Sequence, residues 1–371
     1  MNVTLKKIIK YTINVLLIIG ITVIALNILF KDNEPGAILR EITEADYRWL
    51  LVAVVLMVGF VCAESIQMRM LLKGMKQKVS LFKCILLSNI GFFFSQITPS
   101  ASGGQPLQIV YMTKLGVNGF VSTLVCMMVT LVYKLTLVGL FIIILIIQPG
   151  FVLSSIHDVL FFFIIGILIQ AGVGFFLLAC VLKPSLAMGV VTKSISLGTK
   201  LHIVRHPEET RQKAETSIKQ YVAASDFLKK NTHIMWKMAI ITFLQRLAYF
   251  SVAFCVAMAL NVEECNFLKI VSLQIILSLA VDMLPLPGAS GANEILFTTL
   301  QSEIFKNKVS AGLLLNRGIT YYLLAIVTGV FTLFAHLYFK KIRSGSQALA
   351  QEEDTCTEPG TAADPQIEKQ N

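Results

Sequence analysis

Ile97-Thr98-Pro99-Ser100-Ala101-Ser102-Gly103-Gly104-Gln105-Pro106 interrupts a long apolar run with proline, glycine and small hydroxyl residues. The pattern recurs far downstream as Leu284-Pro285-Leu286-Pro287-Gly288-Ala289-Ser290-Gly291-Ala292-Asn293-Glu294. Both copies contain Pro-x-Ala-Ser-Gly, and both lie in apolar surroundings. In membrane proteins, a repeated break of this kind points to a substrate site.

The composition places both breaks in a membrane protein. The chain has 371 residues, of which 55% are hydrophobic and 15% are charged, whereas charged residues make up roughly a quarter of a soluble protein. Several apolar runs reach the roughly 20 residues that a helix needs to cross a bilayer. The first of them, 8–30, begins beside three lysines but has no Ala-x-Ala cleavage site behind it. We therefore expect a retained helix instead of a signal peptide.

The charge, cysteine and histidine patterns argue against several other classes of protein. The net charge of +10 agrees with lysine and arginine gathering in cytoplasmic loops, so no nucleic-acid partner is expected. The seven cysteines form no C-x-x-C pair and the five histidines are scattered, which predicts neither a disulfide framework nor a metal site. The chain also lacks a G-x-x-x-x-G-K-[ST] loop for nucleotide phosphates. We therefore predict no cofactor and no ATPase activity of its own.

Loop charges predict how the segments are oriented. The 31–48 loop is mainly acidic, whereas 66–80 is basic and 183–231 carries nine lysines and arginines. By the positive-inside rule the first loop is outside and the other two are cytoplasmic, as are both chain termini. Counted from these loops, 148–158 is outside. The segment 81–111, whose first helix is expected at 81–98, enters and leaves on the cytoplasmic side. We therefore predict a re-entrant hairpin with its tip at 99–106.

The second half of the chain repeats this order in the opposite orientation. The segment 267–284 enters, breaks at 285–294 and returns to the outer side, and the last span, at about 311–338, ends at the basic run 340–343. Many secondary transporters are built from two halves that have the same order of segments and opposite orientations in the membrane. The predicted fold is an all-α polytopic membrane protein in an inverted repeat. It has about eight membrane segments, counted as full spans plus two broken re-entrant hairpins.

This architecture divides the chain into a membrane domain and a tail. The membrane domain is predicted at 1–343, with inverted halves at about 49–147 and 235–338 and the cytoplasmic basic loop 183–231 between them. The remaining 344–371 is polar and contains Pro, Gly, Thr and Glu, a composition typical of disorder. We expect a disordered cytoplasmic tail.

Each break is a candidate substrate-binding site. Non-helical backbone at membrane depth is tolerated only where it is buried in protein or faces a water-filled cavity. Free N–H groups at the start of a returning half-helix bind anions, helped by the helix dipole. The alternative is that the small residues only allow the hairpins to pack closely. The substrate-binding candidates in the two tips are Pro99, Ser100, Ser102, Gly103, Gly104, Gln105, Pro287, Gly288, Ser290, Gly291 and Asn293.

Placing a charged side chain within a membrane span costs free energy, so charged residues in the spans point to function. Asp282 and Glu294 flank the second break and are candidates for proton coupling. Glu64 is assigned to the interface, because it lies near the expected inner end of its helix. The alternative is that the charges of the three acidic and three basic groups cancel in pairs, so that these residues form a structural network. The basic groups, which we expect to bind the phosphate of an anionic headgroup, are Lys134, Arg246 and Arg317.

The second break resembles a motif of the membrane region of the lysylphosphatidylglycerol synthase family, which is shared with the multiple peptide resistance factor of bacteria. The family's Pro-x-Pro-Gly-Gly-x-Gly-x-x-Glu is present at 285–294, with Ala289 in place of the second glycine. Arg317 matches the basic residue that follows the motif. The first motif, 98–106, departs from the family pattern because Gln105 stands where an acid is common. The resemblance covers roughly residues 10 to 340.

The resemblance implies a bacterial cytoplasmic-membrane protein that moves an anionic or lysyl-modified phospholipid between leaflets. Its expected partners are a membrane phospholipid similar to phosphatidylglycerol, or a lipid-linked intermediate, and a separate synthase. In the full-length resistance factor, a soluble domain transfers lysine onto phosphatidylglycerol. We expect that domain to be absent, since the longest interior polar stretch has about 49 residues, too few for such a domain.

Other functions stay open. The first is an enzyme of the kind that the family name describes, a phosphatidylglycerol lysyltransferase that modifies lipids and gives resistance to cationic peptide antibiotics. The second is an intramembrane serine protease, because 288–291 matches G-x-S-G and His336 is a candidate base for Ser290. The predicted topology separates these two side chains, which argues against a protease. The others are a transferase acting on a lipid-linked substrate and a structural or regulatory protein.

Overall fold

The computed structural model describes residues 35–183, 189, 226, 230–263 and 265–356. This part of the chain is helical, and the predicted all-α membrane fold is confirmed. The predicted first span, 8–30, and most of the basic loop 183–231 lie outside the described residues. The helical stretches within them that are long and apolar enough to cross a membrane are Tyr47–Gly74, Gly119–Ile147, Leu160–Val181, Thr232–Ala259 and the continuous stretch Ala292–Lys340.

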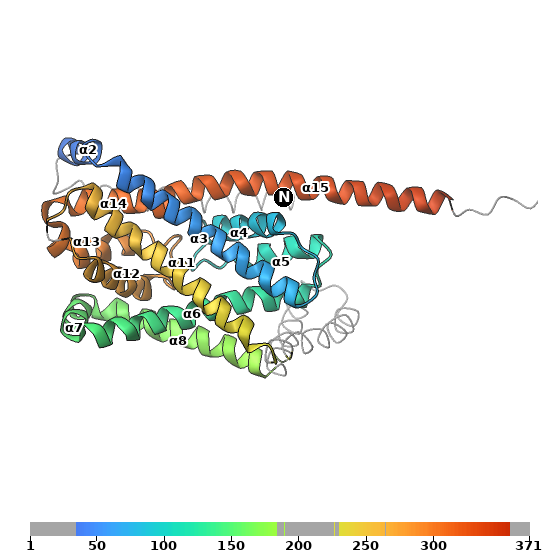
Figure 1. Cartoon of the computed structure of the whole chain (residues 1–371), viewed down its shortest axis with the longest axis horizontal. Helices are drawn as coiled ribbons and strands as arrows, with labels where there is room; N and C mark the ends of the chain where they lie inside the picture. The colour runs from blue at the N-terminus through green and yellow to red at the C-terminus, as the bar shows by residue number, and fades with distance from the viewer. Residues whose placement is uncertain (1–34, 184–188, 190–225, 227–229, 264, 357–371) are drawn as a thin grey trace, which may run out of the picture.

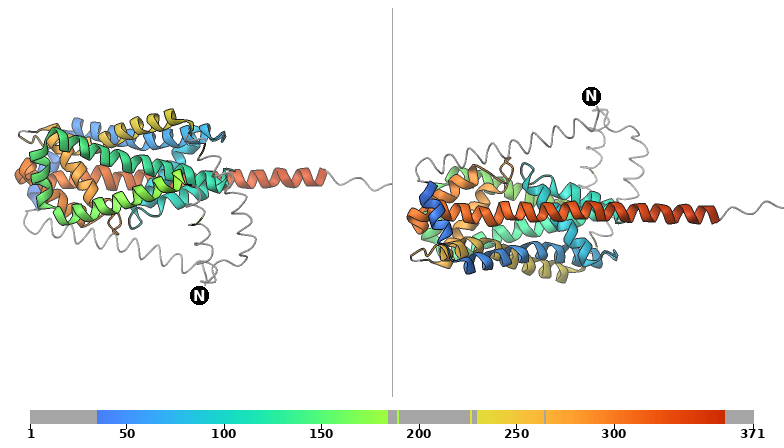
Figure 2. Two further views of the ribbon diagram at one scale, coloured as in Figure 1. Left: turned by 90° about the horizontal axis from the view of Figure 1, so that it is seen from below. Right: turned by 90° about the horizontal axis from the view of Figure 1, so that it is seen from above.

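These long helices run mostly along one axis of the molecule, as Figure 1 shows. Helix α3 (Tyr47–Gly74) packs along α11 (Thr232–Ala259), and α6 (Gly119–Ile147) packs against α8 (Leu160–Leu182). Helix α15 (Leu324–Cys356) lies against the first hairpin and projects beyond the bundle (Figures 1 and 2). The arrangement leaves a core in which the two broken segments lie.

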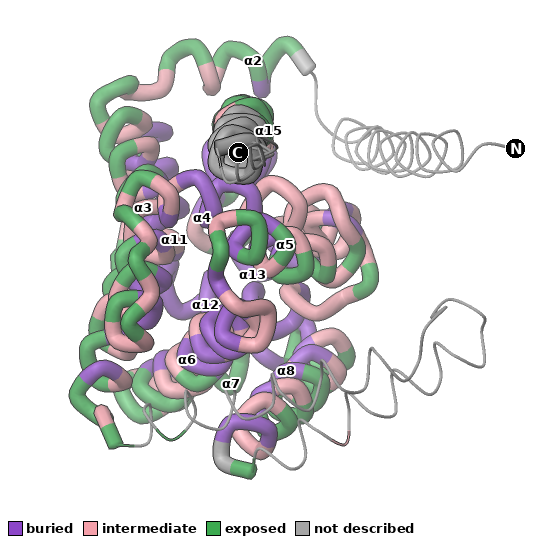
Figure 3. The backbone as a smooth tube through the Cα atoms, turned by 90° about the vertical axis from the view of Figure 1, so that its right-hand side faces the viewer, coloured by how far each residue is buried: buried purple, intermediate pink, exposed green. Residues whose placement is uncertain are grey.

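Exposed side chains on the outer surface of this bundle are largely apolar. Figure 3 shows buried residues gathered toward the centre and exposed ones on the outer faces. Large apolar side chains such as Phe161, Phe175, Trp236 and Leu333 are 69% to 75% exposed. In a soluble monomer such continuous apolar surface is rare, whereas lipid tails solvate it well. The burial pattern therefore agrees with a protein embedded in a bilayer.

The first predicted hairpin consists of α4 (Leu81–Gln96) and α5 (Gly104–Lys114), which pack against each other. Ser80 begins α4, because its hydroxyl oxygen accepts a hydrogen bond from the Lys83 N–H at 3.4 Å. Pro106 lies in the first turn of α5, where a proline costs no helical hydrogen bond. The non-helical segment between the two helices is the tip that the Pro/Gly pattern predicted.

The second hairpin consists of α12 (Phe267–Val281) and α13 (Ala292–Phe305). Asn266 caps α12 by accepting a hydrogen bond from the Lys269 N–H at 3.1 Å. After α13, the Lys308 ammonium donates to the Leu260 carbonyl at 2.7 Å, next to the end of α11. Since α12 starts just after α11, the hairpin returns to the end of the molecule at which it entered.

The two tips meet near the middle of the molecule. Pro99 and Pro287 form an isolated antiparallel bridge between the tips. The Ser100 hydroxyl donates to the Leu284 carbonyl at 3.3 Å. The Tyr321 hydroxyl donates to the Gln96 carbonyl, also at 3.3 Å. In Figure 1 the helices of the two hairpins approach this point from opposite ends, as the predicted inverted arrangement requires.

Several predicted boundaries differ from the structure. The helix expected to end near residue 65 continues to Gly74, because apolar side chains such as Met68 and Leu71 are buried in the core beyond that point. The expected outer loop at 148–158 contains α7 (Pro149–Asp158), which starts with a proline at a favoured position. A disordered tail was predicted from residue 344, whereas α15 continues to Cys356 through residues that include good helix formers such as Ala and Glu.

The last predicted span, 311–338, is built from several helical pieces. A 3₁₀ turn (Lys306–Lys308) leads into α14 (Val309–Arg317), and a π-helical segment, η2 (Gly318–Leu323), joins α14 to α15. Such π segments are frequently found at functional sites. Here the segment follows Arg317 directly and carries Tyr321, so it borders the meeting point of the two tips.

Candidate functional site

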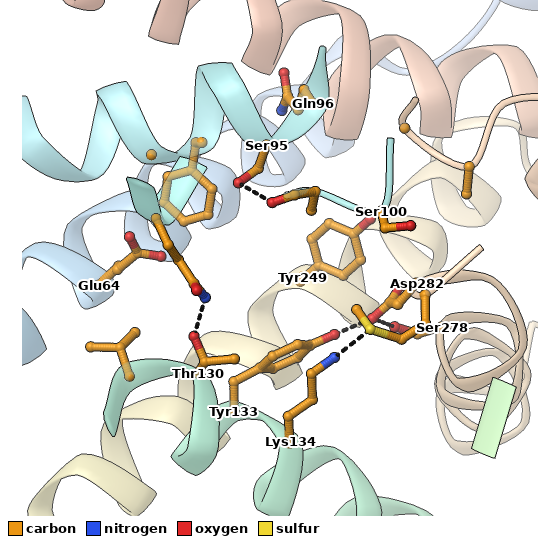
Figure 4. A pocket seen from close by; sticks show the side chains of 18 of the residues that line it. Glu64, Ser95, Gln96, Ser100, Thr130, Tyr133, Lys134, Tyr249, Ser278 and Asp282 are labelled. Atoms are coloured by element: carbon orange, nitrogen blue, oxygen red, sulfur yellow. Dashed lines mark hydrogen bonds between the residues drawn. The ribbon is translucent and has the colours of Figure 1, made fainter. Parts of the chain in front are cut away.

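A cavity of about 620 Å³ lies where the two hairpin tips meet. Its walls come from α3, α6, α8, α11, the η2 segment and both tips. Its lining combines apolar side chains with polar ones such as Glu64, Tyr133 and Asp282, which Figure 4 shows around the cavity. A cavity with polar groups between two broken helices is the setting in which non-helical backbone is tolerated at membrane depth.

Arg246 of α11 brings a cation into this cavity without an acidic partner. Its guanidinium lies 3.9 Å from the ring centre of Tyr133, 5.0 Å from that of Phe60 and 5.9 Å from that of Tyr249. These aromatic faces stabilise the charge. The Arg246 Nε is buried without a hydrogen-bond partner. No carboxylate of the described residues lies within 4.0 Å of the guanidinium. Arg246 is therefore available to an anionic ligand.

Lys134 of α6 provides a second cation with neutral partners. Its ammonium donates to the Gln170 side-chain oxygen of α8 at 2.5 Å and contacts the Met283 sulfur at 3.3 Å. Only 3% of the residue is exposed. Asp282 lies in the same part of the cavity (Figure 4) and accepts hydrogen bonds from the hydroxyls of Tyr133 and Ser278. Lys134 and Asp282 thus lie in the same part of the cavity, but they form no direct ion pair.

Arg317 is engaged differently from the other two cations. Its Nε donates to the Glu294 carboxylate at 2.9 Å, and the two side chains are 7% and 13% exposed. Its Nη2 donates to the Gly288 carbonyl at 3.2 Å and to the Ser290 hydroxyl at 3.3 Å. The guanidinium also stacks on Tyr321 at 4.3 Å. Although Arg317 borders the cavity, most of its contacts are to the second tip, which it holds together.

Glu294 is likewise part of the second tip. Its second carboxylate oxygen accepts a hydrogen bond from the Gly291 N–H at 2.5 Å, which caps α13. Together with the Arg317 pair, this contact uses both oxygens of the carboxylate. Of the two acids predicted for proton coupling, Asp282 lines the cavity, whereas Glu294 is placed in a buried ion pair.

The predicted tip residues fall into two groups. Ser100, Ser102, Gln105, Gly288 and Asn293 line the cavity. The others, Pro99, Gly103, Gly104, Pro287, Ser290 and Gly291, shape the tips without lining it.

Two glycines show why these positions lack a side chain. A Cβ on Gly104 would lie 2.1 Å from the Ser95 hydroxyl and 2.4 Å from the Gly91 carbonyl oxygen, so this residue allows α4 and α5 to approach. Gly288 has a φ of 57°, and a Cβ on it would lie 2.1 Å from the Tyr321 ring. For both glycines the packing interpretation explains the residue type.

Glu64 is a cavity residue that the sequence interpretation missed. Its carboxylate accepts a hydrogen bond from the Gln108 side-chain amide at 2.9 Å. No basic group of the described residues lies within 4.0 Å of it. The sequence placed Glu64 at an interface because α3 was expected to end near residue 65. The buried apolar residues that follow, up to Leu72, are the signal that would have placed it inside the span.

The protease alternative receives no support from the geometry. The Ser290 hydroxyl accepts its hydrogen bond from Arg317 and the residue is 2% exposed. His336 instead shares a hydrogen bond of 2.9 Å with the Tyr111 hydroxyl of α5. A nucleophilic serine needs a base within hydrogen-bond reach, and these two side chains have different partners. Among the residues that the structure covers, no group of three or more His, Cys, Asp or Glu side chains is placed to hold a metal ion.

Comparisons with known proteins agree with the resemblance in the motifs. A family model described as the lysylphosphatidylglycerol synthase TM region matches residues 13–328. A UPF0104 membrane protein of Archaeoglobus fulgidus is 28% identical over 106 residues, which are 29% of this chain and 31% of that protein. A UPF0104 membrane protein of Pyrococcus horikoshii is 29% identical over 105 residues, with 28% and 31% of the two chains covered. The chain thus matches about a third of the length of these archaeal relatives.

Proposed function

This chain belongs to the family of the lysylphosphatidylglycerol synthase TM region, and from that premise we propose that it moves a phospholipid between the two leaflets of a membrane. The observation that carries the proposal is Arg246, a cation in the central cavity with a buried Nε that has no hydrogen-bond partner. A guanidinium presents a planar set of donors that matches the oxygens of a phosphate. The headgroup phosphate is the ligand that fits this position.

The position of the cavity supports the same proposal. A charged headgroup crosses the hydrocarbon region at high cost unless polar groups replace its water. The cavity is lined by both hairpin tips, and the two hairpins approach each other from opposite ends of the molecule, as Figure 1 shows. Lys134 and Arg246 lie 5.1 Å and 3.9 Å from the ring centre of Tyr133, so Lys134 adds positive charge beside Arg246. A headgroup held here is half-way between the two ends.

The acyl chains need an apolar environment, and the cavity has an apolar side along α8 on which the surrounding lipid can continue. Ile169, Val173 and Leu177 of α8 form an apolar part of the lining. Ser102 and Gln105 of the first tip line the cavity and are also exposed. We infer that the headgroup passes these polar side chains while the acyl chains stay in the surrounding lipid. This route requires no soluble carrier.

The basic end of the molecule gives the proposed orientation. Arg69, Lys73, Lys78 and Lys114 lie near the end at which α3 and α5 terminate. Since basic residues favour the cytoplasmic side, we propose that this end faces the cytoplasm. A bacterial origin, a synthase partner and a role in resistance to cationic peptides stay predictions from the resemblance.

The test is a leaflet-exchange assay with the purified protein in phospholipid vesicles that contain acyl-labelled lipid. A reductant added outside destroys the label in the outer leaflet, so the slower loss of the protected label measures exchange. We expect the wild-type protein to accelerate exchange and Arg246→Gln to slow it at least about tenfold, since a charge-assisted hydrogen bond is lost. Arg69→Gln is the matched control, because Arg69 is an exposed arginine outside the cavity.

Two results would reject the proposal. Wild-type vesicles that exchange lipid no faster than protein-free vesicles would remove the translocase function. An Arg246→Gln protein with the wild-type rate, and the wild-type elution profile in detergent, would remove the proposed phosphate site.

A further inference from the structure

We infer that the transported headgroup is zwitterionic, with its phosphate bound by Arg246 and a primary ammonium bound by Glu64. This inference rests on the proposed translocation and names the chemical class of its substrate. It follows from the distribution of charge in the cavity.

Two of the charged groups around the cavity neutralise each other. Arg317 forms its buried ion pair with Glu294 at 2.9 Å. This pair belongs to the second tip and leaves no net charge for a ligand. A substrate that displaced either partner would leave the other buried and unpaired, at a high cost.

Two further charged groups lie together on one side of the cavity. Lys134 and Asp282 are neighbours in Figure 4, and Tyr133, the residue before Lys134, donates its hydroxyl proton to the Asp282 carboxylate. Each also has a neutral partner, Gln170 for Lys134 and Ser278 for Asp282. Their charges balance locally without direct contact.

The remaining two charges are Arg246 and Glu64. Neither has an oppositely charged side chain within 4.0 Å among the residues described. Both line the same cavity. Figure 4 shows Glu64 on the side away from Lys134 and Asp282. The cavity therefore offers one cation and one carboxylate that form no direct ion pair among the described residues, and together they complement a zwitterion.

The Glu64 carboxylate is oriented for a ligand by its single hydrogen-bond partner. The Gln108 amide donates one hydrogen to Glu64 at 2.9 Å and the other to the Leu87 carbonyl at 3.3 Å. Its carbonyl oxygen accepts from the Cys126 thiol. This amide is fixed by those contacts and is 5% exposed. Because a carboxylate accepts up to about four hydrogen bonds, Glu64 keeps acceptor capacity for an ammonium.

A primary ammonium fits this site better than the other common headgroups. A quaternary ammonium has no N–H to donate and is instead recognised by aromatic faces. In this cavity the aromatic faces of Tyr133, Phe60 and Tyr249 are covered by Arg246. A glycerol headgroup would leave the Glu64 charge unpaired, which is unfavourable in a desolvated site. Phosphatidylethanolamine has the required phosphate and primary ammonium.

The experiment compares acyl-labelled phosphatidylethanolamine with acyl-labelled phosphatidylglycerol in the same vesicles. We expect the wild-type protein to move phosphatidylethanolamine about tenfold faster, the factor typical of one charge-assisted hydrogen bond. Glu64→Gln should slow phosphatidylethanolamine and bring the ratio of rates close to one, whereas Arg246→Gln should slow both lipids. Glu303→Gln, the same substitution at an exposed acid outside the cavity, should keep the wild-type ratio.

If Glu64→Gln folds poorly, a second variant and a soluble competitor still test whether the protein prefers a headgroup with a primary ammonium. Glu64→Asp keeps the charge and should retain the preference for the amine. With the wild-type protein, soluble glycerophosphoethanolamine should inhibit exchange more strongly than glycerophosphoglycerol. Equal wild-type rates for the two lipids, or an unchanged ratio in a folded Glu64→Gln protein, would overturn the inference while the translocase proposal stands. If the wild-type protein moves neither lipid, the proposed function itself fails.

Discussion

The two hairpin tips share the Pro-x-Ala-Ser-Gly pattern, yet they are held by different forces. The second tip is held by the buried Arg317–Glu294 ion pair and by the cap that Glu294 provides to Gly291. The first tip is held by neutral contacts. The Thr98 hydroxyl donates to the Phe94 carbonyl at 2.6 Å and accepts from the Gly103 N–H at 2.8 Å.

We expect this difference to give the two tips different parts in the proposed transport cycle. Ser102 and Gln105 of the first tip are exposed, whereas Ser290 of the second is buried. Local opening takes place where backbone contacts are exposed and few. The first tip is therefore the one that we expect to move, and the second is the fixed wall against which it closes. Substitutions that weaken one tip at a time test this comparison.

The largest effect is expected from breaking the ion pair of the second tip. Arg317→Met leaves Glu294 buried without a cation, which costs about 3–5 kcal/mol of unfolding free energy. The double variant Arg317→Met/Glu294→Gln should recover part of this loss because it removes the buried charge. Thermal unfolding in detergent, monitored by circular dichroism, measures the stability of the single and the double variant.

The control for this prediction is the exposed ion pair between Arg40 and Glu44. Arg40 lies in α2 (Pro35–Thr43), and Glu44 is the residue that follows this helix. The two side chains of the pair are 79% and 64% exposed, and such pairs contribute little to stability. Arg40→Met should leave the melting temperature unchanged. If Arg317→Met is as stable as Arg40→Met, the second tip is not held by its ion pair and the comparison fails.

A smaller effect is expected from adding one methyl group at the tip of the first hairpin, where α5 begins. In Gly104→Ala, the new Cβ meets the Ser95 hydroxyl and the Gly91 carbonyl, so α4 and α5 must separate. Overpacking of this kind costs about 1–3 kcal/mol. Gly139→Ala is the control, because nothing lies within 4 Å of a Cβ at this helical position and alanine favours a helix by about 1 kcal/mol. A lower melting temperature for Gly104→Ala together with a higher one for Gly139→Ala would confirm the prediction. A Gly104→Ala protein that melts at the wild-type temperature would contradict it.

The positions of the two breaks could be predicted from the sequence, because Pro and Gly act on the backbone locally. The hairpin helices expected at 81–98 and 267–284 are found at Leu81–Gln96 and Phe267–Val281. The start of each helix also follows from a local signal, the capping side chains Ser80 and Asn266.

The partners of the charged residues could not be predicted in the same way. The pair Arg317–Glu294 and the stacking of Arg246 on Tyr133 join residues that are distant in sequence. In these spans almost every helical position is apolar, so the period of hydrophobicity does not show which face is buried. The position of Glu64 in the cavity was missed for a related reason: the apolar side chains after it were assigned to a loop because basic residues lie among them.

The smallest effect is expected from the neutral contacts of the first tip. Thr98→Val keeps the shape of the side chain but removes its hydrogen bonds to Phe94 and Gly103, which costs about 1 kcal/mol. Opening of the tip then becomes about five times more frequent. Hydrogen–deuterium exchange followed by mass spectrometry should show faster exchange of the amides at 98–104 and unchanged exchange at 288–291.

The same substitution on the second hairpin separates a local effect from a general one. Thr299→Val removes a hydroxyl that bonds only within α13, at an exposed position away from both tips, and should leave exchange at 98–104 unchanged. If Thr98→Val accelerates exchange at both tips equally, the tips open together and the second is not a fixed wall. If only the first tip exchanges faster and lipid movement speeds up with it, opening of the first tip limits transport. The neutral tip is then the gate, and the ion pair of the second tip is what holds the other side of the cavity in place.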